Sequence, residues 1–207
     1  MSLFPIDSSE PINLLPKDGT ANYYGLIYNA IQTDFYLKTF LETIAWKNDE
    51  MNILGTKIVT KRKVAWYGDV SMDYTYSNTT ITALSWTDEL LAIKKKVQNL
   101  TRKSYNACLL NLYHNGSEGL GWHSDKESEL EKAGAIASVT FGAKRKFVFK
   151  HKETKEKVEI FLENGSLLLM KDEIQSHWLH RLPPTTKIHS PRINLTFRTI
   201  VGKGILQ

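Results

Sequence analysis

The sequence contains a single cysteine, Cys108, among its 207 residues. One thiol cannot form an intrachain disulfide, and it cannot supply the several sulfur ligands of a cysteine-based zinc site. Cys108 lies inside the apolar run ACLLNLY. We therefore expect it to pack in the core as a small hydrophobic side chain.

Long apolar runs are also missing. No stretch reaches the roughly 18 consecutive apolar residues of a membrane-spanning helix, and the opening MSLFPIDSSEPINLL has no basic segment followed by an apolar one. We expect a soluble intracellular protein with no membrane partner, cytoplasmic if its source is bacterial and nuclear if it is eukaryotic. The net charge of +5 is compatible with a polyanionic partner, although so small an excess is common in proteins that bind nothing acidic.

The remaining composition is typical of a globular domain. Hydrophobic residues make up 42% of the chain and charged residues 24%, which excludes a disordered or collagen-like chain. A chain of this length can bury a sizeable core. We expect residues 1–207 to form one monomeric domain.

The first half of the chain predicts an arm and two helices. Residues 1–31 contain several prolines and little periodicity, which indicates an irregular arm lying on the domain. Thr33 is expected to cap a helix over 33–46. Thr87 is expected to cap a second helix over 86–103, which has acidic residues in its first turn.

From residue 107 onward the pattern changes to short strands separated by glycines and charged turns. The predicted strands are ACLLNLY, AIASVTF, KFVFKH, KVEIFL, SLLLM, HWLHRL and RINLTFR. Helices ahead of many short strands predict an α+β fold, with N-terminal helices packed on a jelly-roll core over 107–200.

One short motif suggests a metal site. In GWHSDKE, His123 and Asp125 are two residues apart, so in an extended segment their side chains point the same way. His180, in a later strand, is the best-placed third ligand. Two histidines and one carboxylate leave open metal positions, the arrangement used for Fe(II) and O₂ chemistry. Alone, the pair is a weak signal and is more often a solvated turn with a hydrogen-bonded histidine.

The last predicted strand, RINLTFR, carries two arginines on one face. Alternation places apolar side chains on one face and polar ones on the other, the polar set being Arg192, Asn194, Thr196 and Arg198. Burying two guanidiniums that face inward would cost free energy unless anionic groups paired with them. A dicarboxylate ligand would supply two such groups. The alternative is an edge strand whose polar face lies in water.

The H-x-D motif, a distant histidine and R-x-N-x-T-x-R together resemble the AlkB family of Fe(II)/2-oxoglutarate-dependent nucleic-acid dealkylases. The likeness extends from about residue 50 to residue 200 through segments that include KRKVAWYGD, NLYHNG, GWHSDKE and PRINLTFR. It is closest to the branch that acts on duplex DNA. The resemblance implies a double-stranded β-helix and the use of Fe(II), 2-oxoglutarate and O₂.

The resemblance also assigns the catalytic residues. His123, Asp125 and His180 would hold the iron. The distal carboxylate of 2-oxoglutarate would bind Arg192 with help from Tyr113 and Asn194, and the carboxylate beside the keto group would bind Arg198 near Asn111.

Further positions resemble the nucleotide-recognition region of the family, here residues 50–106. Tyr74, Tyr76 and Trp66 would contact a flipped base, although an aromatic stripe is more often core. Glu127 would favour a cationic methylated base. Leu54 and Gly55 match a hairpin that would push an apolar side chain into the base stack. Arg62 and the lysines of the segment from Lys150 to Lys157 would contact phosphates.

The implied activity is oxidative removal of alkyl groups from N1-methyladenine and N3-methylcytosine in single- or double-stranded DNA, with RNA as a further candidate. In direct-reversal repair of this kind, the N-alkyl carbon is hydroxylated and leaves as an aldehyde. Two alternatives remain open: the same chemistry on RNA or protein, and a non-enzymatic jelly-roll binding module with a vestigial metal triad.

Overall fold

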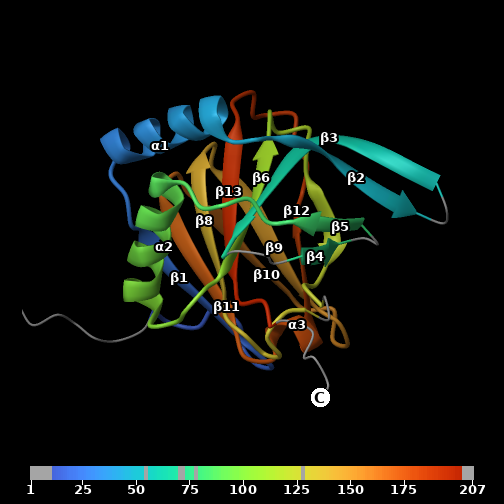
Figure 1. The fold of residues 1–207 in the computed structure, drawn as a ribbon. Helices are drawn as coiled ribbons and strands as arrows, with labels where there is room; N and C mark the ends of the chain where they lie inside the picture. Colours follow the sequence, from blue (N-terminus) through green and yellow to red (C-terminus); the bar gives the residue numbers. More distant parts are fainter. Residues whose placement is uncertain (1–10, 54–55, 70–72, 77–78, 127–128, 202–207) are drawn as a thin grey trace, which may run out of the picture.

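The computed structural model describes residues 11–53, 56–69, 73–76, 79–126 and 129–201 (Figure 1). These residues form three helices, α1 (Ala30–Thr43), α2 (Asp88–Thr101) and α3 (Ile174–His177). The strands before α2 are β1 (Thr20–Leu26), β2 (Lys47–Ile53), β3 (Thr56–Gly68), β4 (Asp73–Tyr76) and β5 (Thr79–Thr82). The later strands are β6 (Ala107–Tyr113), β7 (Leu120–His123), β8 (Ile136–Gly142), β9 (Arg145–His151), β10 (Lys157–Leu162), β11 (Ser166–Lys171), β12 (Trp178–Leu182) and β13 (Arg192–Arg198). None of the helices among these residues could span a membrane.

The strands form a jelly roll of two main sheets, as predicted. The larger sheet has the order β1-β11-β8-β13-β6-β3-β2, the smaller sheet has the order β10-β9-β12-β7, and β4 pairs with β5. Helices α1 and α2 cover one face of the larger sheet (Figure 1). The predicted bounds of β6, β10 and β13 are confirmed.

The alternation predicted for β13 is confirmed. Ile193, Leu195 and Phe197 are fully buried in the core between the helices and the larger sheet. Strand β13 lies between β8 and β6, so the edge-strand alternative is wrong. The side chains of its polar face are buried and line a cavity to which both main sheets contribute. Cys108 of β6 is also fully buried in this core, as predicted, and burial raises the pKa of its thiol.

Two predictions for the N-terminal part are wrong in detail. Residues 20–26 of the expected irregular arm form β1, because β11 offers them an antiparallel partner. Helix α1 begins after Asn29, whose side chain accepts a hydrogen bond from the Gln32 backbone in a capping box. Thr33 lies inside the helix and donates its hydroxyl to the Ala30 carbonyl.

Helix α2 has the predicted N-cap. The Thr87 hydroxyl accepts the Leu90 N–H at 3.3 Å. The helix ends at Thr101, and Arg102 takes the left-handed conformation with φ of 55°. Arg102 therefore lies at the C-cap of α2.

The β2–β3 ribbon extends away from the jelly roll (Figure 1). Its pairing is interrupted: Asn48 opposes Lys63, whereas Glu50 opposes Val59. Asp49 therefore faces the additional residues 60–62 of β3. Irregularities of this kind bend a strand and redirect its side chains, and here they redirect two charged groups into the site described next.

Candidate active site

The predicted metal triad comes together between the two sheets. His123 at the end of β7 and His180 in β12 are opposite one another in the antiparallel pairing of these strands. Asp125 follows β7 directly. The donor atoms of the three side chains lie within 4.8 Å of one another, and both histidine Nε2 atoms are 3.9 Å from Asp125 Oδ1. These residues could hold one metal ion.

Neighbouring groups orient the triad. His123 Nδ1 lies 2.8 Å from the Gly121 carbonyl. A carbonyl can only accept, so Nδ1 carries the proton and the Nε2 lone pair is directed to the metal position. Arg198 Nη2 donates to Asp125 Oδ2 at 2.8 Å, which leaves Oδ1 directed toward the histidines.

The charge states also suit a metal. Burial raises the pKa of Asp125. Arg198 and the two histidines lower this pKa by more than burial raises it, so the net shift is downward. Burial and the neighbouring His123 lower the pKa of His180 to about 3. An ionised carboxylate and a neutral imidazole are the forms that bind metal ions.

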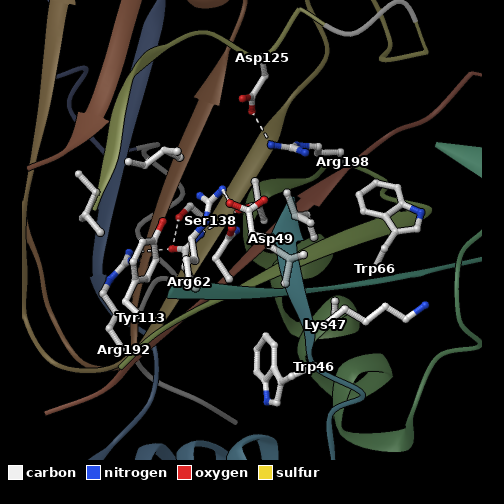
Figure 2. A pocket seen from close by; sticks show the side chains of 18 of the residues that line it. Trp46, Lys47, Asp49, Arg62, Trp66, Tyr113, Asp125, Ser138, Arg192 and Arg198 are labelled. Atoms are coloured by element: carbon white, nitrogen blue, oxygen red, sulfur yellow. Dashed lines mark hydrogen bonds and ion pairs between the residues drawn. The ribbon is translucent and has the colours of Figure 1, made fainter. Parts of the chain in front are cut away.

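A cavity of about 870 Å³ opens beside the triad (Figure 2). Its walls come from β2, β3, β6, β7, β8, β9, β11, β12 and β13, which means that both main sheets contribute. Small-molecule sites have volumes of about 300–1,000 Å³. The cavity is therefore large enough for more than a metal ion.

One end of the cavity is suited to a carboxylate. Arg192 is 2% exposed, and its Nη2 donates to Thr140 Oγ1 at 2.9 Å and to Asn194 Oδ1 at 2.8 Å. Its Nε has no hydrogen-bond partner, and no acidic side chain pairs with it, among the residues that the structure describes. Burial lowers the pKa of this guanidinium to about 10. A buried cation with only neutral partners marks an anion site.

The other residues predicted for the cosubstrate line the same cavity. Arg192 Cζ lies 5.6 Å from the centre of the Tyr113 ring. Asn111 of β6 is opposite Asn194 of β13, and both face the cavity. Arg198 also lines it, 5% exposed and bonded to Asp125. The structure thus gathers all the predicted cosubstrate residues beside the triad, and their binding roles remain predictions.

The structure places the base-recognition residues only in part. Trp66 of β3 lines the cavity and is 2% exposed. Tyr74 and Tyr76 belong to β4, but their side chains lie outside the part of the chain that is described. Leu54, Gly55 and Glu127 also lie outside the described residues.

Arg62, which was predicted to contact phosphate, does not lie on the surface. Its side chain is buried and forms a salt bridge at 2.8 Å with Asp49, which also accepts the Thr60 hydroxyl at 2.9 Å. The irregular β2–β3 pairing turns Arg62 into the cavity and away from solvent. Among the predicted basic contacts at 150–157, Lys152 is occupied by the backbone carbonyls of Gln175 and Ser176.

Sequence reasoning missed two buried charges here. Asp49 lies in the run KNDEM, and nothing in the sequence distinguishes it from the neighbouring polar and charged residues, which are typical of a solvent-exposed segment. Arg145, 1% exposed, donates to the backbone carbonyls of Asn115, Gly116, Glu118 and Pro183. It thereby fixes the loop that leads into β7 and His123.

A second group of possible ligands, Asp18, His151 and His177, lies elsewhere. The Thr154 N–H donates to His151 Nδ1 at 3.1 Å. His151 Nε2 must then carry the proton, which it donates to Asp18 Oδ2 at 3.1 Å. This bond holds the N-terminal segment on the jelly roll, and it uses the nitrogen that a metal would need.

Comparisons with known proteins agree with this geometry. The family model described as the 2OG-Fe(II) oxygenase superfamily matches residues 23–198. The DNA oxidative demethylase ALKBH2 of Mus musculus is 32% identical over 198 residues, which cover 90% of this chain and 83% of that protein. ALKBH2 of Homo sapiens is 41% identical over 148 residues, 68% of this chain and 57% of the human protein.

Two further proteins are similar. The human alpha-ketoglutarate-dependent dioxygenase alkB homolog 3 is 34% identical over 179 residues, 82% of this chain and 62% of that protein. The solved structure of OsALKBH1 has a TM-score of 0.58 at 16% identity, covering 89% of this chain and 99% of that one. At this identity the likeness supports the fold alone.

Proposed function

Because this chain belongs to the AlkB branch of the 2OG-Fe(II) oxygenase superfamily, we propose that it oxidatively removes alkyl groups from nucleobases in DNA. One observation carries the proposal: a His-Asp-His triad and a buried arginine without an acidic partner among the described residues line the same cavity. The first suits Fe(II), and the second suits a carboxylate of 2-oxoglutarate. The activity is direct-reversal repair.

Each side chain of the site has a role in this proposal. His123, Asp125 and His180 hold Fe(II), and Arg198 keeps Asp125 ionised and oriented. The distal carboxylate of 2-oxoglutarate binds Arg192, Tyr113 and Asn194. Its other carboxylate is bound by Arg198 and Asn111.

When bound, Fe(II) with 2-oxoglutarate and O₂ supplies an oxidation that hydroxylates the N-alkyl carbon and yields succinate and CO₂. The protein positions the carbon and excludes water. The alkyl group then leaves the base as an aldehyde.

We propose N1-methyladenine and N3-methylcytosine as substrates. Their alkyl groups lie on the pairing edge, so the base must leave the helix to be reached. The cavity has room for a base beside the cosubstrate, and Trp66 supplies an aromatic wall. The contributions of Tyr74, Tyr76 and Glu127, the nucleotide-recognition role of residues 50–106 and a monomeric single domain over 1–207 belong to the same proposal.

The test is formaldehyde release from N1-methyladenine in single-stranded and duplex DNA, with and without 2-oxoglutarate. Release should require 2-oxoglutarate and should be abolished by His180→Ala, His123→Ala or Asp125→Ala. Release only from methylated RNA or from a peptide panel would move the substrate to those classes. Turnover that persists in His180→Ala would remove that residue from the triad.

A further inference from the structure

Arg62 and Asp49 form a buried ion pair in the wall of the proposed active site. Arg62 is 4% exposed and Asp49 is 2% exposed. The pair joins β3 to β2 at the point where their pairing is interrupted. Replacing a buried ion pair by apolar side chains is often neutral or stabilising. Stability alone therefore does not account for this pair.

The pair lies against Tyr113. Arg62 Cζ is 5.9 Å from the centre of the Tyr113 ring. Burial lowers the pKa of Arg62, but Tyr113 and Asp49 raise it more through charge and hydrogen bonding, so the net shift is upward. Figure 2 shows Arg62 and Tyr113 on the same side of the cavity as Arg192. Arg62 thus contacts the end proposed to bind the distal carboxylate.

The guanidinium groups of Arg62, Arg145 and Arg192 lie around the Tyr113 ring. They differ in the groups with which they form hydrogen bonds or ion pairs. Arg145 is engaged by four backbone carbonyls. Arg192 has neutral partners and is the proposed anion ligand. Arg62 is neutralised by Asp49. It can therefore act on Tyr113 as a hydrogen-bond donor without competing with Arg192 for the carboxylate.

We propose that Arg62 is a positioning residue for the cosubstrate: it orients the Tyr113 hydroxyl toward the distal carboxylate of 2-oxoglutarate, and Asp49 holds Arg62 in place. The inference rests on the proposed 2-oxoglutarate site. It also means that the β2–β3 ribbon, which overlaps the predicted nucleotide-recognition region, is connected to the cosubstrate end of the cavity. A change in the Arg62–Asp49 pair at the base of this ribbon would then alter 2-oxoglutarate affinity.

The experiment is calorimetric titration of the Mn(II)-loaded full chain with 2-oxoglutarate, without nucleic acid. Arg62→Gln alone would leave Asp49 buried without its cation, so the main variant is the double substitution Arg62→Gln with Asp49→Asn, which keeps a neutral polar pair. We expect its Kd for 2-oxoglutarate to rise about tenfold, the size expected for one hydrogen bond to a charged group. Arg62→Lys should recover part of the loss.

Tyr113→Phe completes a double-mutant cycle. If Arg62 acts through Tyr113, then Tyr113→Phe should weaken binding in the parent protein but have little further effect in the Arg62→Gln/Asp49→Asn background. Lys63→Gln removes the neighbouring cation of β3, which does not line the cavity, and it should leave the Kd unchanged.

Additive losses in the cycle, or an unchanged Kd in the Arg62→Gln/Asp49→Asn variant, would overturn the inference. If the proposed function is wrong, the result is different: the parent protein itself does not bind 2-oxoglutarate or does not demethylate DNA. Melting temperatures recorded for every variant separate a weakened site from a weakened fold.

Discussion

Asp125 uses its two carboxylate oxygens for different purposes. Oδ2 accepts a hydrogen bond from Arg198, and Oδ1 faces both histidines of the triad. The arginine keeps the carboxylate ionised in a buried position. Arg192, in contrast, has no such partner in the described part of the chain. This difference predicts different consequences when each arginine is removed.

Arg192→Ala should weaken 2-oxoglutarate binding by about 2–5 kcal/mol, the range for losing one partner of a buried charge pair. Arg192→Lys should restore only part of this, because an ammonium cannot bind a carboxylate with a planar fork. The ligand-free variant should stay folded, since the substitution removes an uncompensated buried charge. Titration with 2-oxoglutarate and thermal melting measure both effects. An unchanged Kd would refute the assignment of Arg192.

The pKa of His180 predicts how the metal-free protein responds to acid. Burial and His123 lower this pKa to about 3 from an ordinary value near 6.5. Below about pH 6.5 the unfolded chain therefore binds a proton that the folded protein does not. The free energy of unfolding should fall by up to about 1.4 kcal/mol for each pH unit between about 6.5 and 4.5.

The control for this prediction is His180→Gln, which has no imidazole at this position. Denaturant unfolding of both metal-free proteins across the same pH range gives the comparison. The stability difference between parent and variant should shift in favour of the variant as the pH falls. Parallel curves would contradict the low pKa.

At the scale of elements, the β2–β3 ribbon carries two kinds of residue. Asp49 and Arg62 are buried at its base, and Leu54 is the residue predicted to wedge into the base stack. A wedge helps only where there is a stack to hold open, and unstacking costs a few kcal/mol for each step. The ribbon is therefore expected to discriminate between duplex and single-stranded substrates.

Leu54→Ala should lower the ratio of duplex to single-strand repair rates and leave 2-oxoglutarate binding unchanged. Leu54→Phe should restore or raise that ratio. The alternative makes Leu54 a core leucine, whose truncation would cost about 2–5 kcal/mol of stability. In that case both rates and the melting temperature would fall together. Measuring the two rates beside thermal melting decides between a wedge and a scaffold residue.

At the scale of the whole molecule, the site joins the two main sheets. His123 and His180 belong to the smaller sheet, whereas Arg192 and Tyr113 belong to the larger one. A ligand set that contacts both sheets binds only the folded protein. Binding should therefore stabilise the whole fold by mass action.

Mn(II) with 2-oxoglutarate should raise the free energy of unfolding by about 2.7 kcal/mol when the cosubstrate is at roughly 100 times its Kd. For a chain of this size, that corresponds to an increase in Tm of about 5–10 °C. Calorimetric melting with and without the two ligands measures it. His180→Ala should show little of this increase, and an equal increase in that variant would place the metal elsewhere.

The sequence alone determined the features that depend on local periodicity. The side-chain alternation of β13 follows from a repeat of two residues, and so does the shared direction of His123 and Asp125. The Thr87 cap depends only on adjacent residues. The capping box at Asn29 is equally local and is present in the sequence as N-A-I-Q, so the true start of α1 is also encoded by adjacent residues.

Only the tertiary structure decided which distant segments meet. Strand pairing brings His180 opposite His123, and pairing with β11 turns residues 20–26 into a strand. The interrupted β2–β3 pairing buries Arg62 beside Asp49, where the sequence indicated a surface cation. The local sequence around a charged residue does not show whether its side chain faces water or a buried partner, because that environment is formed by residues far away in the chain.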